Sequence, residues 1–99
     1  MSYQEAESRL DKVPADLIAE FDRRIREYAS TRQEVNSRNA ANNFLKAKVY
    51  GEQWRNETND MAGQTMGILI RRILKDELGW NAENVEDKIT GRSYYIYRN

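Results

Sequence analysis

A single apolar stripe between residues 64 and 78 constrains the fold of this chain more than any other feature. Its members are Met66, Leu69, Ile70, Ile73, Leu74 and Leu78. They recur every three or four positions, which places them on one broad face of an α-helix. Gly79 follows directly, where a helix commonly ends. The pattern therefore predicts a core helix over residues 64–78.

Two further helices are predicted upstream. Residues 14–30 begin with Pro14, which suits a first helical turn, and carry apolar residues at helical spacing. On the outer face of this helix, we expect ion pairs between Glu20 and Arg24 and between Arg23 and Glu27. A second helix is predicted over residues 37–50, closed near Gly51, with Trp54 packing on a further turn.

The remaining N-terminal segments are polar or weakly patterned. Residues 1–12 have apolar side chains at spacings of three and four but no clear cap, and are treated as an uncertain arm. Residues 31–43 are rich in asparagine, which favours a loop or a helix start. Residues 55–60 are expected to form a loop before the core helix.

The C-terminal part predicts a β-hairpin. Strand-forming residues lie at 85–89 and 93–97, after a polar connection at 81–84, and Gly91 between them suits a tight turn. The alternation leaves open whether Tyr94 and Ile96 or Tyr95 and Tyr97 face inward. With 99 residues, the chain is expected to form one domain over residues 13–99, of α+β class and mostly helical.

The absence of cysteine and histidine excludes most catalytic chemistry. Without these residues, the chain lacks the usual zinc ligands, the commonest general base and every thiol or Ser-His nucleophile. Glu83, Glu86 and Asp87 form a small carboxylate cluster, but without the loop geometry that Ca²⁺ or Mg²⁺ requires. We expect no enzyme activity, no metal site and no cofactor.

Hydropathy and charge indicate where the protein is located and which kinds of partner it can have. No segment approaches the roughly 20 apolar residues of a membrane span, and the N-terminus has no secretion pattern, so a cytoplasmic protein without a membrane partner is expected. The formal net charge is zero, but acidic residues dominate residues 1–22 and basic residues dominate residues 23–55. Bulk charge alone therefore does not predict a polyanion partner.

Residues 65–97 carry a family resemblance. They read TMGILIRRILKDELGW, a variable stretch, and then KITGRSYYIY. This helix ending in Leu-Gly, followed by strands with Gly-Arg and aromatic residues, resembles the winged-helix region that closes many phage and plasmid primase-helicases and related mobile-element replication proteins. The resemblance implies a winged-helix-like three-helix domain with a C-terminal hairpin. It also implies that the ATPase and primase activities belong to other domains.

The resemblance implies a nucleic-acid-binding site on the core helix and the hairpin. Residues 64–78 would be the recognition helix and residues 88–93 the wing. Basic side chains on the free face of that helix could reach phosphates or base edges in duplex DNA. The candidate nucleic-acid-binding residues are Gln64, Arg71, Arg72, Lys75, Lys88 and Arg92.

Two functions remain open. The leading interpretation is a small DNA-binding protein of phage or mobile-element type that acts in replication or transcription control. The alternative is a protein-protein interaction module, an adaptor or an inhibitor of a host protein, which the mixed-sign surface suits equally well. Ile68, expected to be exposed on the recognition face, suggests a protein interface, including a homodimer. Tyr94 to Tyr97 could stack on bases, but sheet packing explains them too.

Overall fold

The predicted core helix forms the centre of the molecule. The structure, a computed structural model, describes residues 3–99. Helix α5 (Ala62–Arg71) continues into a π-helical turn over Arg72–Glu77, and Gly79 ends the helical segment with a φ of 73°. Only glycine adopts this conformation without strain. The prediction of a core helix here is confirmed.

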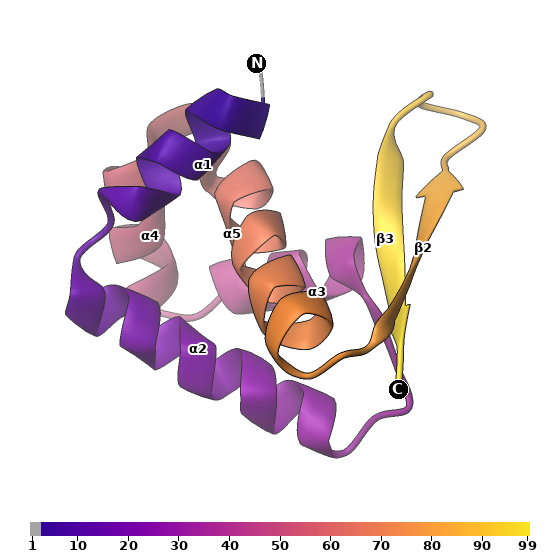
Figure 1. Cartoon of the computed structure of the whole chain (residues 1–99). Coiled ribbons are helices and arrows are strands. Elements are labelled where there is room, and N and C mark those ends of the chain that lie inside the picture. The colour runs from indigo at the N-terminus through magenta and orange to yellow at the C-terminus, as the bar shows by residue number, and fades with distance from the viewer. Residues whose placement is uncertain (1–2) are drawn as a thin grey trace.

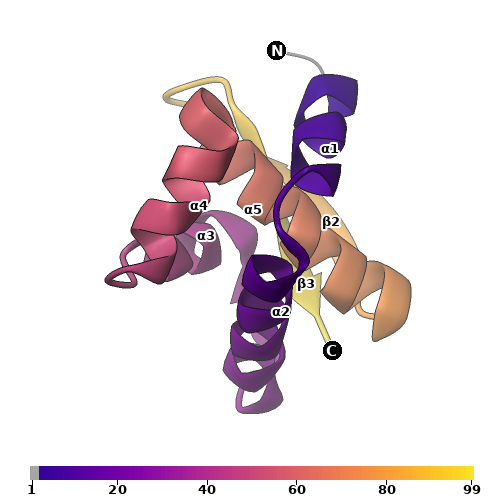
Figure 2. The same ribbon diagram turned by 90° about the vertical axis from the view of Figure 1, so that its left-hand side faces the viewer.

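Four other helices surround α5 (Figures 1 and 2). They are α1 (Tyr3–Asp11), α2 (Ala15–Ser30), α3 (Ser37–Leu45) and α4 (Tyr50–Thr58). The strands are β1 (Glu34–Asn36), β2 (Asn81–Glu86) and β3 (Ser93–Arg98), and the last two form the C-terminal hairpin. The predicted α+β, mostly helical class is confirmed, with five α-helices and three strands among residues 3–99.

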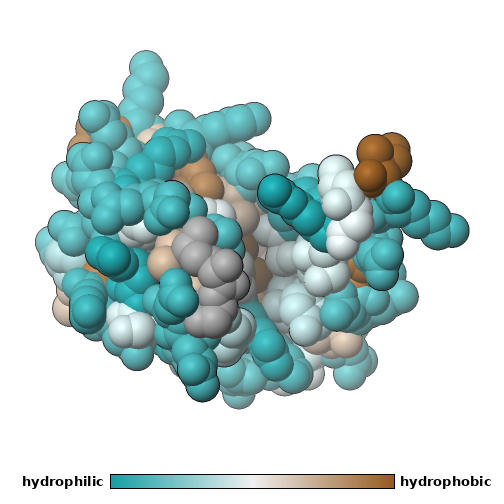
Figure 3. Space-filling view, turned by 90° about the horizontal axis from the view of Figure 1, so that it is seen from above, coloured by the Kyte–Doolittle hydropathy of each residue, from teal (hydrophilic) through white to brown (hydrophobic). Residues whose placement is uncertain are grey.

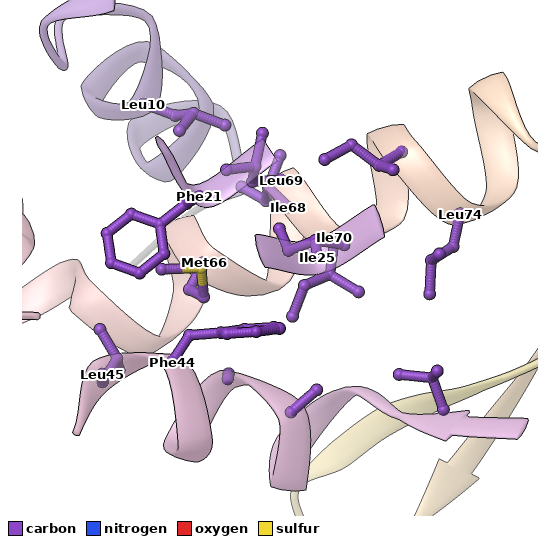
Figure 4. Close-up of a cluster of buried hydrophobic side chains, with 14 of the residues drawn as sticks. Leu10, Phe21, Ile25, Phe44, Leu45, Met66, Ile68, Leu69, Ile70 and Leu74 are labelled. Atoms are coloured by element: carbon purple, nitrogen blue, oxygen red, sulfur yellow. The ribbon is translucent and has the colours of Figure 1, made fainter. Parts of the chain in front are cut away.

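The core is built where the apolar faces of these helices meet (Figure 4). Phe21 of α2 and Trp54 of α4 are both fully buried, and their rings pack edge to face with centroids 5.1 Å apart. The Trp54 Nε1–H group donates to the carbonyl of Ala62 and to Oγ1 of Thr65. Trp54 therefore joins α4 to the start of α5 by packing and by hydrogen bonds.

Helix α2 matches its prediction closely. It begins at Ala15, directly after Pro14, and ends at Ser30. The two predicted ion pairs are present, with Nε of Arg24 2.6 Å from Glu20 and Nη1 of Arg23 3.0 Å from Glu27. Arg24 and Arg23 together lower the pKa of the Glu20 carboxyl below its ordinary value.

The region between α2 and α5 differs from the prediction. The expected helix over residues 37–50 ends at Leu45, and residues 50–58, partly expected as a loop, form α4. Asn36 starts α3, because its side-chain oxygen accepts from the amides of Arg38 and Asn39. The chain then turns sharply at Val49, whose φ of 65° is rare for a β-branched residue.

The N-terminal segment forms α1 and packs against α5. Ala6 and Leu10 are buried in the core. Part of the segment expected to be an arm is thus a helix that covers one side of α5 (Figure 1). Residues 1–2 lie outside the described part.

The sheet is antiparallel in the order β1-β3-β2. Strand β1, which the sequence did not predict, pairs Val35 with Tyr97, while β2 pairs Val85 with Tyr94. Strand β2 already begins at Asn81, so residues 81–84 belong to the strand. The expectation that they form a polar connection is wrong. Tyr97 is 1% exposed and Tyr95 packs against the core, which settles the open choice of the inward face.

Candidate functional site

A groove separates α5 from the β2–β3 hairpin (Figure 3). It consists of two adjoining hollows that share Gln64 and Gly67. One hollow, of about 230 Å³, lies between α1, α5 and Tyr95 of β3. The other, of about 700 Å³, lies between α3, the start of α5 and residues 91–94. We call the two together the hairpin groove.

Small residues keep the hairpin groove open. Gly67 lies on its floor, and a Cβ atom added there, or at Gly63, would meet no atom within 4 Å. Ala6 and Ala41 line the walls on the α1 and α3 sides. The hollow therefore follows directly from the local sequence, because larger side chains at these positions would fill it.

The charged side chains that line the groove are all arginines. Arg38 comes from α3, Arg71 from α5 and Arg92 from the end of the hairpin loop, and no Asp or Glu is among the described lining residues. Arg71 and Arg92 form no ion pair with any carboxylate of residues 3–99. The groove is thus a cationic site on a chain whose formal net charge is zero.

Two of these guanidinium groups are held against tyrosine rings. The Cζ atom of Arg38 lies 4.4 Å from the centre of the Tyr94 ring, and that of Arg71 lies 5.5 Å from the centre of the Tyr95 ring. Both distances fall within cation–π range. These contacts restrict the two side chains, which reduces the entropy lost when an anion binds them.

The hairpin itself is braced against α3. Oδ1 of Asp87 accepts hydrogen bonds from the amides of Ile89 and Thr90, and Oδ2 accepts from Nη1 of Arg38. Arg38, and then these two backbone amides, lower the pKa of the Asp87 carboxyl below its ordinary value. Within this turn, the side chain of Ile89 is 95% exposed and that of Lys88 is also exposed.

The structure brings three of the six predicted site residues together. Gln64, Arg71 and Arg92 line the hairpin groove. Lys88 lies in the exposed hairpin loop, and Lys75 is exposed on the π-helical turn. These two lysines are outside the set of groove-lining residues.

Arg72 has a different environment from Arg71. Its guanidinium lies 3.4 Å from Glu7 and 3.3 Å from Asp11, both on α1. Arg72 therefore pairs with carboxylates of α1, the helix that packs against this side of α5. Ile68, expected to be exposed, is 5% exposed because it packs in the core, so that expectation is wrong.

Two groove residues have no signal in the sequence. Arg38 follows the cap of α3 and reaches the hairpin only because β1 pairs with β3. Tyr3, 52% exposed, lines the hollow beside α1. Both contacts depend on segments more than 50 residues apart in the chain, which helix and strand periodicity cannot bring together.

The described residues do not support a different kind of site. Within residues 3–99, no three acidic side chains form a group that could hold a metal ion, and no helix is long and apolar enough to cross a membrane. Arg23, Arg24 and Arg26 of α2 are all in ion pairs. The hairpin groove is therefore the strongest candidate site. Comparison of the chain with models of protein families, with curated proteins and with solved structures found no match.

Proposed function

We propose that this chain is a DNA-binding module whose contact surface is the hairpin groove. The observation that carries the proposal is that three arginines line the groove and that two of them, Arg71 and Arg92, form no ion pair with the described residues, whereas Arg38 is paired with Asp87. Such a concentration of positive charge in a hollow attracts an anionic chain even when the total charge is zero. Nucleic acid supplies the matching row of phosphates.

Arginine is suited to this role. Its planar guanidinium donates two parallel hydrogen bonds to a phosphate, and it stays charged at every physiological pH. Gln64, exposed between the two hollows, adds a neutral donor and acceptor that could contact a base edge. Phosphate contacts would supply affinity, and Gln64 a limited preference for sequence.

The order of the elements also supports the proposal. A helical region that ends in α5 and is followed by the β2–β3 hairpin agrees with the winged-helix resemblance of residues 65–97. In that interpretation, the hairpin is the wing, and Lys88 and Arg92 flank its tip. The resemblance implies a role in the replication or transcription control of a phage or another mobile element.

Salt-dependent DNA binding tests the proposal. The chain should bind a fluorescein-labelled DNA at low salt, with an affinity that falls steeply as salt rises, because bound cations are released from phosphates. The double variant Arg71→Ala/Arg92→Ala should bind at least tenfold more weakly. A matched variant, Lys46→Ala/Arg55→Ala, removes two exposed positive charges outside the groove and should bind like the parent chain.

Two results would contradict this function. One is no change in fluorescence anisotropy at low salt with a folded parent chain. The other is an equal loss of DNA affinity in the two double variants, which would mean that positive charge outside the groove contributes as much as positive charge inside it. Circular dichroism of each variant establishes that the fold is retained.

A protein partner is the second candidate, and the hairpin tip favours it. Ile89 is 95% exposed on a turn that Asp87 holds in place, so a protein partner could bury this apolar side chain without having to order the turn first. A stoichiometric complex with one purified protein, abolished by Ile89→Ser, would select this function if DNA does not bind.

A further inference from the structure

We infer that the hairpin groove takes a single nucleic-acid strand rather than a duplex. The inference rests on the proposed function and adds the form of the ligand. It follows from the position of α5 within the groove. The exposed or half-buried residues Gln64, Gly67 and Arg71 form the stripe of α5 that lines the hairpin groove.

That stripe is recessed between two walls. On one side, α1 packs along α5, and Ala6 lines the same hollow as Gly67. On the other side, the Arg71 guanidinium lies 5.5 Å from the centre of the Tyr95 ring on β3. A helix reads duplex DNA by entering a major groove about 12 Å wide between two phosphate backbones. Here α1 and the hairpin would meet those backbones before α5 could enter.

Charge on the α1 side adds to this obstacle. Glu7 and Asp11 lie beside the stripe, where both are paired with Arg72. A duplex laid over α5 would bring a phosphate backbone close to these carboxylates. Arg72 is already occupied by them, so it is a poor phosphate ligand. Arg71 and Arg92, which form no ion pair with the described residues, lie inside the hairpin groove.

A single strand fits the same features. It has one backbone, which can follow Arg71 and Arg92 along the groove. Its unpaired bases can lie against the apolar hollow formed by Ala6, Ile68 and the Tyr95 ring. Tyr3, 52% exposed beside this hollow, offers a ring on which a base can stack.

The test compares a labelled oligothymidine with a blunt duplex of equal length at the same salt concentration. We expect the oligothymidine to bind at least tenfold more tightly than the duplex. Tyr3→Ala should weaken oligothymidine binding about tenfold, through lost stacking. Unlabelled polyglutamate, an anionic chain without bases, should compete poorly.

Gly67 provides a variant that tests the groove itself. Because a Cβ atom there meets nothing within 4 Å, Gly67→Leu should fold while filling the floor of the groove. It should weaken oligothymidine binding at least tenfold. Gly67→Ala adds only a methyl group and should bind like the parent chain.

The outcomes separate this inference from the proposed function. Duplex binding as tight as oligothymidine binding would overturn the single-strand inference and leave DNA binding standing. Equal competition by polyglutamate, or full binding by a folded Gly67→Leu variant, would overturn it as well. No binding of either DNA would overturn both.

Discussion

Nη1 of Arg38 on α3 donates a hydrogen bond of 2.8 Å to Oδ2 of Asp87, at the end of β2. The two residues are 49 positions apart, and their contact ties the hairpin turn to the helical part of the molecule. The same guanidinium packs over the Tyr94 ring and lines the hairpin groove. One side chain thus links the position of the hairpin to the charge of the candidate site.

Removing the Asp87 carboxylate should loosen the hairpin turn. In Asp87→Ala, the amides of Ile89 and Thr90 lose their acceptor, so their hydrogen exchange should become faster while exchange in α5 stays unchanged. Glu86→Ala is the matched control, since it removes a neighbouring exposed carboxylate that forms no ion pair with the described residues. Unchanged exchange at both amides would show that Asp87 does not hold the turn.

The same contact predicts a pH dependence. Folding lowers the pKa of Asp87 from its ordinary value of 3.8, so the carboxylate stabilises the folded turn above that pH. This contribution is lost as the pH falls through the lowered pKa. The amide chemical shifts of Ile89 and Thr90 should therefore titrate with a midpoint below 3.8, and Asp87→Asn should abolish the transition. A midpoint at or above 3.8 would contradict the contact.

Gly51 should not tolerate a side chain. A Cβ atom at this position would lie 2.4 Å from the carbonyl oxygen of Leu45, where α3 ends. Gly51→Ala should lower the free energy of unfolding by about 1–3 kcal/mol, because the backbone must move. Gly63→Ala, where the Cβ atom meets nothing, should be neutral or stabilising. Urea denaturation of the two variants measures the difference.

Val49 should be more stable as glycine. Its φ of 65° and ψ of −65° are unfavourable for a β-branched residue, and its side chain is 60% exposed, so little packing is lost on truncation. Val49→Gly should raise the free energy of unfolding by about 1 kcal/mol through relief of this strain. Val49→Ala removes the same exposed methyl groups but keeps a Cβ atom, and should gain less. A destabilised glycine variant would argue against strain at this turn.

Apolar burial, rather than its ion pairs, should hold α1 against α5. Leu10 is 2% exposed, and Leu10→Ala should cost about 2–5 kcal/mol. Arg72 pairs with Glu7 and Asp11 at a partly exposed site, so Arg72→Ala should cost less than about 1 kcal/mol. Thermal denaturation of both variants checks the order. A larger loss of stability in Arg72→Ala than in Leu10→Ala would show that the ion pairs, and not apolar burial, hold α1 against α5.

The elements predicted well from sequence are those whose signal is local. The stripe from Met66 to Leu74 identified α5, and Pro14 marked the start of α2 to within one residue. Gly91, with φ of 73°, lies in the predicted hairpin connection. In each case, the residues that determine the element lie within it or next to it.

The features missed depend on distant partners. The three residues of β1 form a strand only because Ile96 to Arg98 lie beside them. Ile68 looked exposed beside Gly67, but it is 5% exposed and belongs to the core. Of the residues that line the hairpin groove, Gln64, Arg71 and Arg92 are among those that the winged-helix resemblance implies, whereas Arg38 is not. Its approach to Tyr94 is a tertiary contact.

The pairing of β1 with β3 also determines when this molecule can complete its fold during synthesis. Glu34 to Asn36 leave the ribosome early, but their partners, Ile96 to Arg98, are made some 60 residues later. Until then, the core lacks the buried Tyr97 ring, and β1 has an unpaired edge. Nascent chains that stop before Ile96 should therefore be open to proteases around Val35, and chains that include Arg98 should be resistant.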